Sequence, residues 1–164
     1  MFGPWAETLR RHHALEHATI ALLVGRLPPG TRLMGLAIHD GFCLLGNVST
    51  EAVEAAATEA LARLKAGESS LAVSPSCGTN LAVTGIMAGV ASILALGQGP
   101  RWRHLPDVMT AAVLAVVAAQ PLGRLAQKYI TTSPDLAGVE IAAVKGGSLG
   151  RLRYHQVATR AEAS

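Results

Sequence analysis

Charged residues are scarce in this chain: they make up 15% of its 164 residues, and aromatic residues make up another 4%. A soluble domain usually carries about 25% charged residues. Half of the residues are hydrophobic, so we expect part of the chain to face something other than water. The basic residues behind the net charge of +3 are scattered. Because a nucleic-acid surface needs clustered positive charge and aromatic stacking platforms, the composition argues against nucleic-acid binding.

Cysteine is also rare, since Cys43 and Cys77 are the two present. No other feature indicates an oxidising compartment, and we therefore expect two free thiols rather than one disulfide. The N-terminus lacks the pattern of a secretory signal, because its apolar run, residues 18–24, is short and polar residues interrupt the approach to it. The N-terminal region is therefore expected to remain in the mature protein.

Local signals at both ends of the chain predict an α+β fold. Pro4 favours the start of a helix, and the Pro-Pro-Gly sequence at 28–30 must end it. A second helix is predicted from Ser49 or Thr50, either of which can cap it, to about Ala66. Strands are expected at residues 31–38, 42–48, 70–73, 139–144 and 152–158, with turns at 40–41 and 146–148. The predicted fold is a small sheet with two packed helices.

Two segments in the middle of the chain, residues 81–96 and 108–123, contain no charged residue. Each is close to the lower limit of about 17 residues for crossing a bilayer, and their Ala, Gly and Val content permits close helix packing in lipid. The alternative is a buried hairpin of a soluble protein, but one small domain can hardly cover two such helices on all sides. We predict a two-helix transmembrane hairpin over 81–123. It interrupts the α+β fold between a first portion, 1–80, and a C-terminal β-hairpin, 124–164, that completes the sheet.

The connection between the two apolar segments holds two of the 14 Lys and Arg residues, and the flanking portions hold the others. Basic residues near membrane helices favour the cytoplasmic side. We therefore expect the α+β portion to lie in the cytoplasm and the hairpin to lie in a bacterial inner (cytoplasmic) membrane. The lipid bilayer is then one partner of the chain.

The densest cluster of reactive side chains lies in the first predicted helix, where residues 13–17 have the pattern H-x-x-E-H. His13 and His17 are four residues apart, so on a helix they lie on one face and can hold one zinc ion. Glu16 falls on the same side and can take a proton from a water molecule at the metal. This is the inverted form of the H-E-x-x-H motif. The alternatives without metal are three polar residues on a partly exposed helix end, or a hydrogen-bonded polar trio in the core.

A zinc site needs at least one further protein ligand. Cys77 is favoured, because thiolate is a strong zinc ligand and Gly78 lets the backbone approach closely. Other candidates are the histidine and acidic side chains His39, Asp40, Glu51, Glu54 and Glu59. A fourth protein ligand, from His12 or Asp40, would close the site and indicate a non-catalytic metal.

The order of these motifs resembles the S-ribosylhomocysteine lyase family over roughly residues 9–80. The shared features are H-x-x-E-H on a helix, a strand pair containing Gly41-Phe42, a following helix, and Cys77-Gly78-Thr79. H-x-x-E-H also resembles the motif of the pitrilysin-type peptidases, which have a related fold. The resemblance implies a metal held by His13, His17 and Cys77, and it implies that Glu16 is the nearby acid or base.

The chain departs from the lyases in two respects. Ile38 stands where the alignment places their catalytic cysteine, and a hydrophobic hairpin follows the C-G-T segment. Both differences argue against lyase activity on a soluble sugar thioether. The chain also resembles an uncharacterised bacterial membrane family that has H-H-A-L-E-H-A-T, N-V-S-T and C-G-T-N segments, which implies a fold but no activity.

These patterns together predict a membrane-anchored, zinc-dependent hydrolase, and specifically a peptidase that acts on a membrane-associated peptide or protein. Glu16 is the predicted catalytic base and His39 a second acid or base, whereas Thr79 and Asn80 are candidates for binding substrate. One alternative is a non-catalytic metal-binding membrane protein, with a structural zinc site or a role as a metal sensor or assembly factor. Another is a membrane interaction module without metal, in which the histidines only pack. The lyases are dimers, so the resemblance also implies a homodimer.

Overall fold

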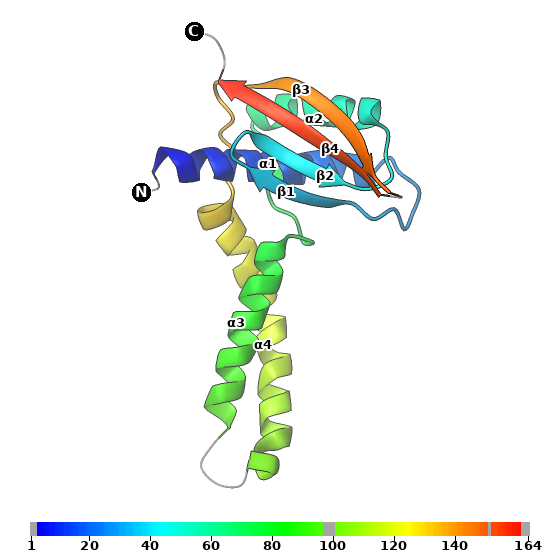
Figure 1. Cartoon of the computed structure of the whole chain (residues 1–164). Coiled ribbons are helices and arrows are strands. Elements are labelled where there is room, and N and C mark those ends of the chain that lie inside the picture. The colour runs from blue at the N-terminus through cyan, green and yellow to red at the C-terminus, as the bar shows by residue number, and fades with distance from the viewer. Residues whose placement is uncertain (1–2, 97–100, 151, 162–164) are drawn as a thin grey trace. The chain divides into compact units, whose positions relative to one another are not determined.

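A computed structural model describes residues 3–96, 101–150 and 152–161, and in this part of the chain it has four α-helices and four strands (Figure 1). The predicted α+β class is confirmed. The chain divides into two compact units: one combines Met1–Ser74 with Ile130–Ser164, and the other is Pro75–Tyr129. Each unit is described by itself below.

The first unit is built on an antiparallel sheet with the order β1-β2-β4-β3. Its strands are β1 (Met34–Ile38), β2 (Gly41–Leu45), β3 (Val139–Leu149) and β4 (Leu152–Ala161). The last strand of the chain therefore lies inside the sheet, paired with β2 on one side and with β3 on the other. Strand β1 pairs with β2 alone among the described strands, which leaves β1 at an edge.

Two helices cover one face of this sheet, α1 (Pro4–Val24) and α2 (Thr50–Lys65) (Figure 1). Helix α1 contacts β1 and β2, helix α2 contacts β3 and β4, and the two helices contact each other. The core between the layers is apolar, and its fully buried members include Leu15, Phe42, Leu44, Val53 and Val157. Burial of such side chains is the main favourable term in folding.

Helix α1 begins at the proline that the sequence predicted, with Pro4 in its first turn, and Gly25 follows its last residue. Every residue from Ala14 to Thr19 is buried, so the middle of this helix is enclosed on all sides rather than on one face. Most of the H-x-x-E-H motif therefore lies in the interior of the unit, where polar groups need partners.

Helix α2 is capped by Ser49, whose Oγ accepts a hydrogen bond from the backbone N–H of Ala52 at 3.2 Å. Its buried stripe has helical spacing and consists of Val53, Ala56, Ala57, Ala60 and Leu64. The helix ends at Lys65, and Gly67 follows with φ of +94°, a conformation that favours glycine. The predicted second helix is confirmed.

The predicted strand at 70–73 is wrong. Residues Ser69–Ala72 form a short 3₁₀ helix, η1, in which the amide of Leu71 donates to the carbonyl of Glu68 at 3.1 Å. Contacts with α1 and α2 bury Ala72 in this compact form. These local backbone hydrogen bonds replace the hydrogen bonds that a neighbouring strand would have supplied.

The predicted turn at 146–148 is also wrong, because these residues lie within β3 and the chain reverses around Gly150, which has φ of +64°. Gly146 and Gly147 are needed for space rather than for a turn. A Cβ atom at Gly146 would overlap the Oγ1 of Thr50, and one at Gly147 would overlap the ring of Tyr154. Glycine in a strand often marks such a close approach.

The second unit is a helical hairpin of α3 (Gly78–Ala95) and α4 (Leu105–Ala126). A short 3₁₀ segment, η2 (Arg101–His104), precedes α4, and a π-helical segment, η3 (Gln127–Thr131), follows it. Helix α4 begins three residues before the predicted segment and ends three residues after it.

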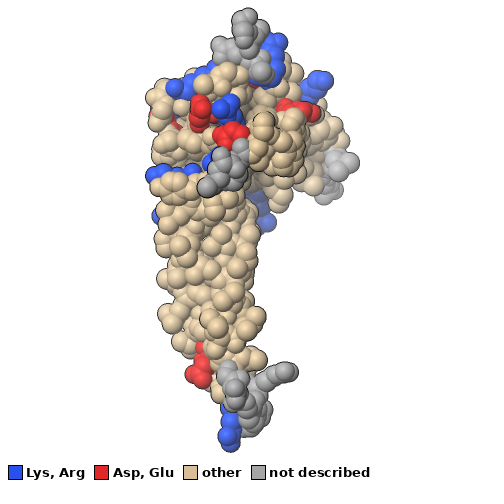
Figure 2. Space-filling view, turned by 90° about the vertical axis from the view of Figure 1, so that its left-hand side faces the viewer, with Lys and Arg blue, Asp and Glu red and all other residues tan. Residues whose placement is uncertain are grey.

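Both helices are long and apolar enough to cross a membrane, with mean hydropathy of 1.5 over Gly78–Ala95 and 1.6 over an 18-residue stretch within Leu105–Thr131. Only 6% of the first stretch and 17% of the second is buried. Large apolar side chains such as Leu81, Ile93 and Val117 are exposed. Figure 2 shows the visible face of the hairpin as a long surface with charged side chains only towards its ends. A core helix of a soluble protein would be mostly buried, so the exposure supports association with a membrane.

Candidate metal centre

His13 and His17 lie side by side on α1, as their spacing predicts. Their ring centroids are 4.3 Å apart and the rings are tilted by 59°. The side chain of His17 is 4% exposed and that of His13 is 21% exposed. The pair is thus close enough to share one ion, and one of the two rings is fully inside the protein.

A backbone carbonyl holds each ring. The Nδ1 of His13 lies 2.9 Å from the carbonyl oxygen of Thr131, and the Nδ1 of His17 lies 2.8 Å from that of Ala72. A carbonyl oxygen can only accept, so Nδ1 is the donor in both rings and Nε2 carries the lone pair of the neutral imidazole. Histidine ligands of metals are typically oriented in this way.

Glu16 lies beside both Nε2 atoms. Its Oε2 is 3.9 Å from the Nε2 of His13 and 3.7 Å from the Nε2 of His17, and the residue is 5% exposed. The carboxylate therefore faces the atoms that would bind a metal. At these distances Glu16 can act either as a base beside a bound metal or as a further metal ligand.

Gly35 on β1 makes room for this carboxylate. A Cβ atom at Gly35 would overlap the Oε1 of Glu16, so the edge strand passes directly against the acidic side chain. Sequence reasoning missed Gly35. The available signal was a glycine in the interior of a predicted strand, which often marks a close approach.

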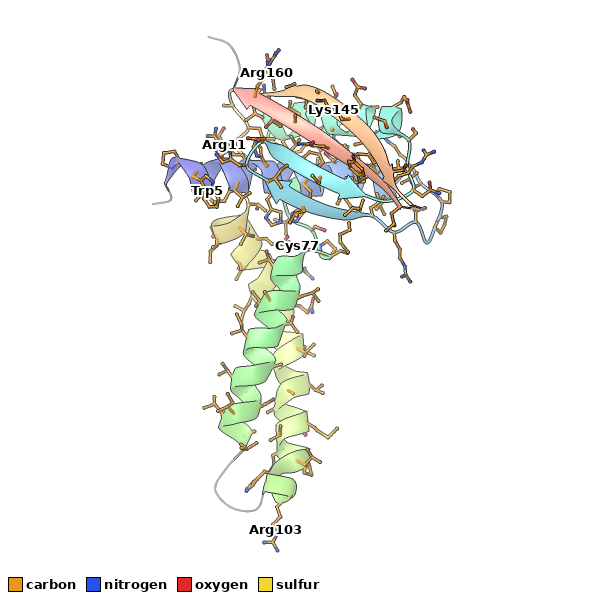
Figure 3. The ribbon with its side chains drawn as sticks, viewed as in Figure 1. Trp5, Arg11, Cys77, Arg103, Lys145 and Arg160 are labelled. Carbon is orange, nitrogen blue, oxygen red and sulfur yellow. The ribbon has the colours of Figure 1, made fainter. Side chains whose placement is uncertain are left out.

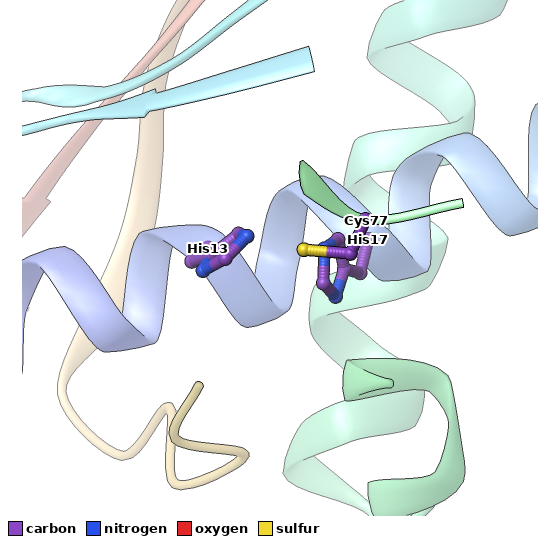
Figure 4. A group of neighbouring side chains, drawn as sticks. All are labelled: His13, His17 and Cys77. Carbon is purple, nitrogen blue, oxygen red and sulfur yellow. The ribbon is translucent and has the colours of Figure 1, made fainter. Parts of the chain in front are cut away.

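Cys77 joins the two histidines. The ligand atoms of His13, His17 and Cys77 all lie within 4.8 Å of one another, so this group can hold a metal ion (Figure 4). Cys77 is buried and caps α3, and its Sγ accepts a hydrogen bond from the amide of Thr79 at 3.4 Å. A helix N-terminus favours negative charge, which suits the thiolate form in which cysteine binds metals.

The path of the chain also limits the distance between the thiol and this pair. Cys77 lies five positions after Ala72, whose carbonyl oxygen holds His17. A fully extended segment of that length spans at most about 18 Å. Covalent connection alone therefore limits how far Cys77 can lie from the histidines.

His12 does not take part in the group, although it is adjacent to His13. Its Nδ1 lies 2.8 Å from the carbonyl oxygen of Ile38, and its Nε2 lies 2.7 Å from the Oγ1 of Thr159. Burial lowers the pKa of His12. Because both ring nitrogens are engaged, His12 connects α1 to β1 and β4, and the hypothesis of a fourth ligand at this position loses support.

His39 and Asp40 lie at the turn between β1 and β2. The Nδ1 of His39 is 3.2 Å from the Oδ1 of Asp40, and both side chains are more than half exposed. The ring of His39 also stacks on Trp5 at 6.5 Å. His39 is not a member of the three-residue metal group, and its role as a second acid or base stays a prediction.

The amide of Asn80 is engaged within the hairpin. Its Nδ2 donates to the carbonyl of Pro75 at 2.8 Å, and its Oδ1 accepts from the Nε2 of Gln127 at the same distance. A side chain at Gly123 would overlap Asn80. Asn80 thus connects α3 to η3 and packs against α4, and substrate binding by Thr79 or Asn80 stays a prediction.

The acidic residues of α2 that were candidate ligands lie elsewhere. Glu51 and Glu54 are exposed near the start of the helix. Glu59 is paired with Arg26 and with Arg63. Two of these carboxylates therefore lie near the start of the helix, where negative charge is favourable, and the third forms surface ion pairs.

Comparison with known proteins places the chain in a family without an assigned activity. Residues 8–144 match the family described as a domain of unknown function, DUF6391. A relative, the uncharacterized protein SYNPCC7002_A1392 of Picosynechococcus sp. (strain ATCC 27264 / PCC 7002 / PR-6), is 36% identical over 144 residues, which cover 78% of this chain and 67% of the relative. No solved structure matches the chain. The resemblance to the lyases and pitrilysins therefore stays a prediction, and the chain belongs to the DUF6391 family.

Proposed function

We propose that this protein is a membrane-anchored, zinc-dependent hydrolase, and specifically a peptidase that acts on a membrane-associated peptide or protein. One observation carries the proposal: the Glu16 carboxylate faces the Nε2 atoms of two histidines whose Nδ1 atoms are held by carbonyl oxygens. Hydrogen-bonded imidazoles beside a buried carboxylate are the parts that metal-assisted hydrolysis needs.

Zinc is the metal that this donor set suits best. Two imidazole nitrogens and one thiolate, from His13, His17 and Cys77, are common zinc ligands and leave a fourth position open. When bound there, zinc activates water and polarises a carbonyl group. Glu16 is not a member of the three-residue group, and we assign it proton transfer rather than metal binding.

The residues of the chain then have separate tasks. The Glu16 carboxylate accepts a proton from the water whose oxygen attacks the carbonyl carbon of the scissile peptide bond. The carbon–nitrogen bond breaks, and Glu16 returns the proton to the leaving amine. The carbonyl oxygens of Ala72 and Thr131 keep the two imidazoles in the required tautomer and orientation throughout.

The chain connects this group to both candidate membrane helices. Cys77 immediately precedes α3, and Thr131, whose carbonyl oxygen holds His13, ends the π-helical segment after α4. A site formed by residues at these helix ends lies near the bilayer surface, which favours a membrane-associated substrate. We place the first unit on the cytoplasmic side of a bacterial inner membrane, on the basis of the Lys and Arg distribution.

Burial supports one alternative, a non-catalytic metal site. Glu16, His17 and Cys77 are each at most 7% exposed, and structural zinc sites are typically closed to water. In that case Glu16 acts as a fourth ligand or as a partner of the ligands, and the protein is a metal sensor or an assembly factor.

Glu16→Gln separates the two functions. The experiment measures zinc in the purified full chain and hydrolysis of a library of acylated, internally quenched peptides in vesicles, with Cys77→Ala as the matched variant. For a hydrolase, Glu16→Gln retains zinc and loses hydrolysis by about 100-fold or more, whereas Cys77→Ala loses zinc. Bound zinc without hydrolysis by the wild type would establish the non-catalytic alternative. A wild type without zinc would overturn both.

A further inference from the structure

The end of α4 carries two basic side chains next to an exposed aromatic ring. Arg124 and Lys128 are four residues apart, about one helical turn, and both are exposed. The Nζ of Lys128 lies 5.3 Å from the ring centre of Tyr129, which is 61% exposed. We call Arg124, Lys128 and Tyr129 the headgroup surface.

The spacing of charges along α4 matches the thickness of a bilayer. No charged residue lies between Asp107 and Arg124, which are 17 residues apart. At 1.5 Å per residue they are separated by about 26 Å, close to the roughly 30 Å of a hydrocarbon core. Within the hairpin, Cys77 precedes α3 at one end, and Arg103 lies at the opposite end (Figure 3).

This spacing sets the depth of the headgroup surface. In a bilayer whose hydrocarbon layer covers the uncharged stretch of α4, Arg124 falls at the boundary of that layer, and Lys128 falls about 6 Å further out, at the level of the lipid phosphates. Tyrosine is enriched at this level because its ring is apolar and its hydroxyl is polar. Next to these residues on α4, Leu122 and Leu125 are 44% and 48% exposed, so acyl chains can contact them.

We propose that the headgroup surface binds the phosphate of an anionic phospholipid. Arg124 can make paired hydrogen bonds to phosphate, and Lys128 adds a compact positive charge. The adjacent exposed leucines indicate a lipid rather than a free phosphate, since free phosphate has no apolar part for them to contact. The proposal rests on the membrane location in the proposed function, but it is independent of the metal and of hydrolysis.

The test compares lipid retention by full-length variants in detergent, measured by native mass spectrometry. The probes are phosphatidylglycerol, phosphatidylcholine and inorganic phosphate. The double variant Arg124→Gln/Lys128→Gln removes both charges, and Arg124→Lys/Lys128→Arg keeps them. Lys145→Gln is the control, because Lys145 lies on β3 in the first unit. Circular dichroism and thermal melting show whether each variant is folded.

Wild type should retain phosphatidylglycerol in preference to phosphatidylcholine. The glutamine double variant should lose roughly 30-fold in that preference, whereas the charge-retaining variant and Lys145→Gln should keep it. A folded glutamine variant with the preference of the wild type would overturn the proposal. Displacement of the lipid by millimolar phosphate would identify a soluble-phosphate site instead. Glu16→Gln should leave lipid preference unchanged, so failure of the hydrolase proposal shows separately.

Discussion

Gly35 on strand β1 and Glu16 on helix α1 are so close that a single methyl group at the glycine would overlap the carboxylate. The strand thereby fixes the position of the side chain that faces both histidine Nε2 atoms. Strand β1 and helix α1 together thus determine the geometry of the metal centre.

Gly35→Ala should displace Glu16 and lower hydrolysis at least tenfold while zinc stays bound. Overpacking of this kind also costs about 1–3 kcal/mol of stability. The measurements are turnover, zinc content and the free energy of unfolding. Gly25→Ala is the matched control, because a Cβ there would make only ordinary contacts at 3.6 Å. Unchanged turnover in a folded Gly35→Ala protein would contradict the role given to Glu16.

Zinc should stabilise the first unit if His13, His17 and Cys77 hold it. A ligand that binds only the folded state at 100 times its Kd adds about 2.7 kcal/mol to the unfolding free energy. Thermal melts with zinc and with a chelator measure this difference. His17→Ala should abolish it, whereas His39→Ala, at an exposed turn, should retain it. Equal melting of the wild type with zinc and with chelator would count against a metal site.

His12→Ala should destabilise the fold without removing zinc. The variant loses contacts with Ile38 and Thr159, and an unsatisfied buried group costs about 1–3 kcal/mol. Chemical denaturation and zinc content distinguish this outcome from a ligand role. Loss of zinc with unchanged stability would make His12 the fourth ligand after all.

His155 should make the stability of the first unit sensitive to mild acid. The residue is 1% exposed, and burial lowers the pKa of its imidazole. The unfolded chain takes up a proton near pH 6.5 while the folded state resists it, so the unfolding free energy falls as the pH drops below that value. The slope is at most about 1.4 kcal/mol per pH unit. His155→Asn should show a smaller loss between pH 7.5 and 5.5 than the wild type, and an equal loss would refute this cause.

Asn80 and Gln127 should be energetically coupled in the stability of the hairpin. Each single alanine variant breaks the same hydrogen bond between α3 and η3, which within a membrane contributes about 0.6–1.7 kcal/mol. A double-mutant cycle on the stability of the hairpin measures the coupling. If Asn80 instead binds substrate, Asn80→Ala raises KM whereas Gln127→Ala does not.

Local sequence patterns were enough to predict several parts of this structure. The capped helix α2 follows from Ser49 and its apolar stripe. The apposition of His13, Glu16 and His17 follows from helical periodicity, which needs no other part of the chain. Length and hydropathy alone also indicate the two candidate spans. In each case the deciding interactions are between residues a few positions apart, or between side chains and solvent.

Other features depend on contacts that local sequence does not encode. The pairing of β4 with β2 joins segments more than 100 residues apart. The glycines at 146 and 147 make room for neighbouring side chains and do not form a turn. His12 and His13 are adjacent and of one chemical type, yet Thr159 engages the first and Thr131 holds the second. Periodicity determines which side chains share a face of a helix, whereas packing determines which partner each nitrogen meets. That second choice separates a structural histidine from a candidate metal ligand.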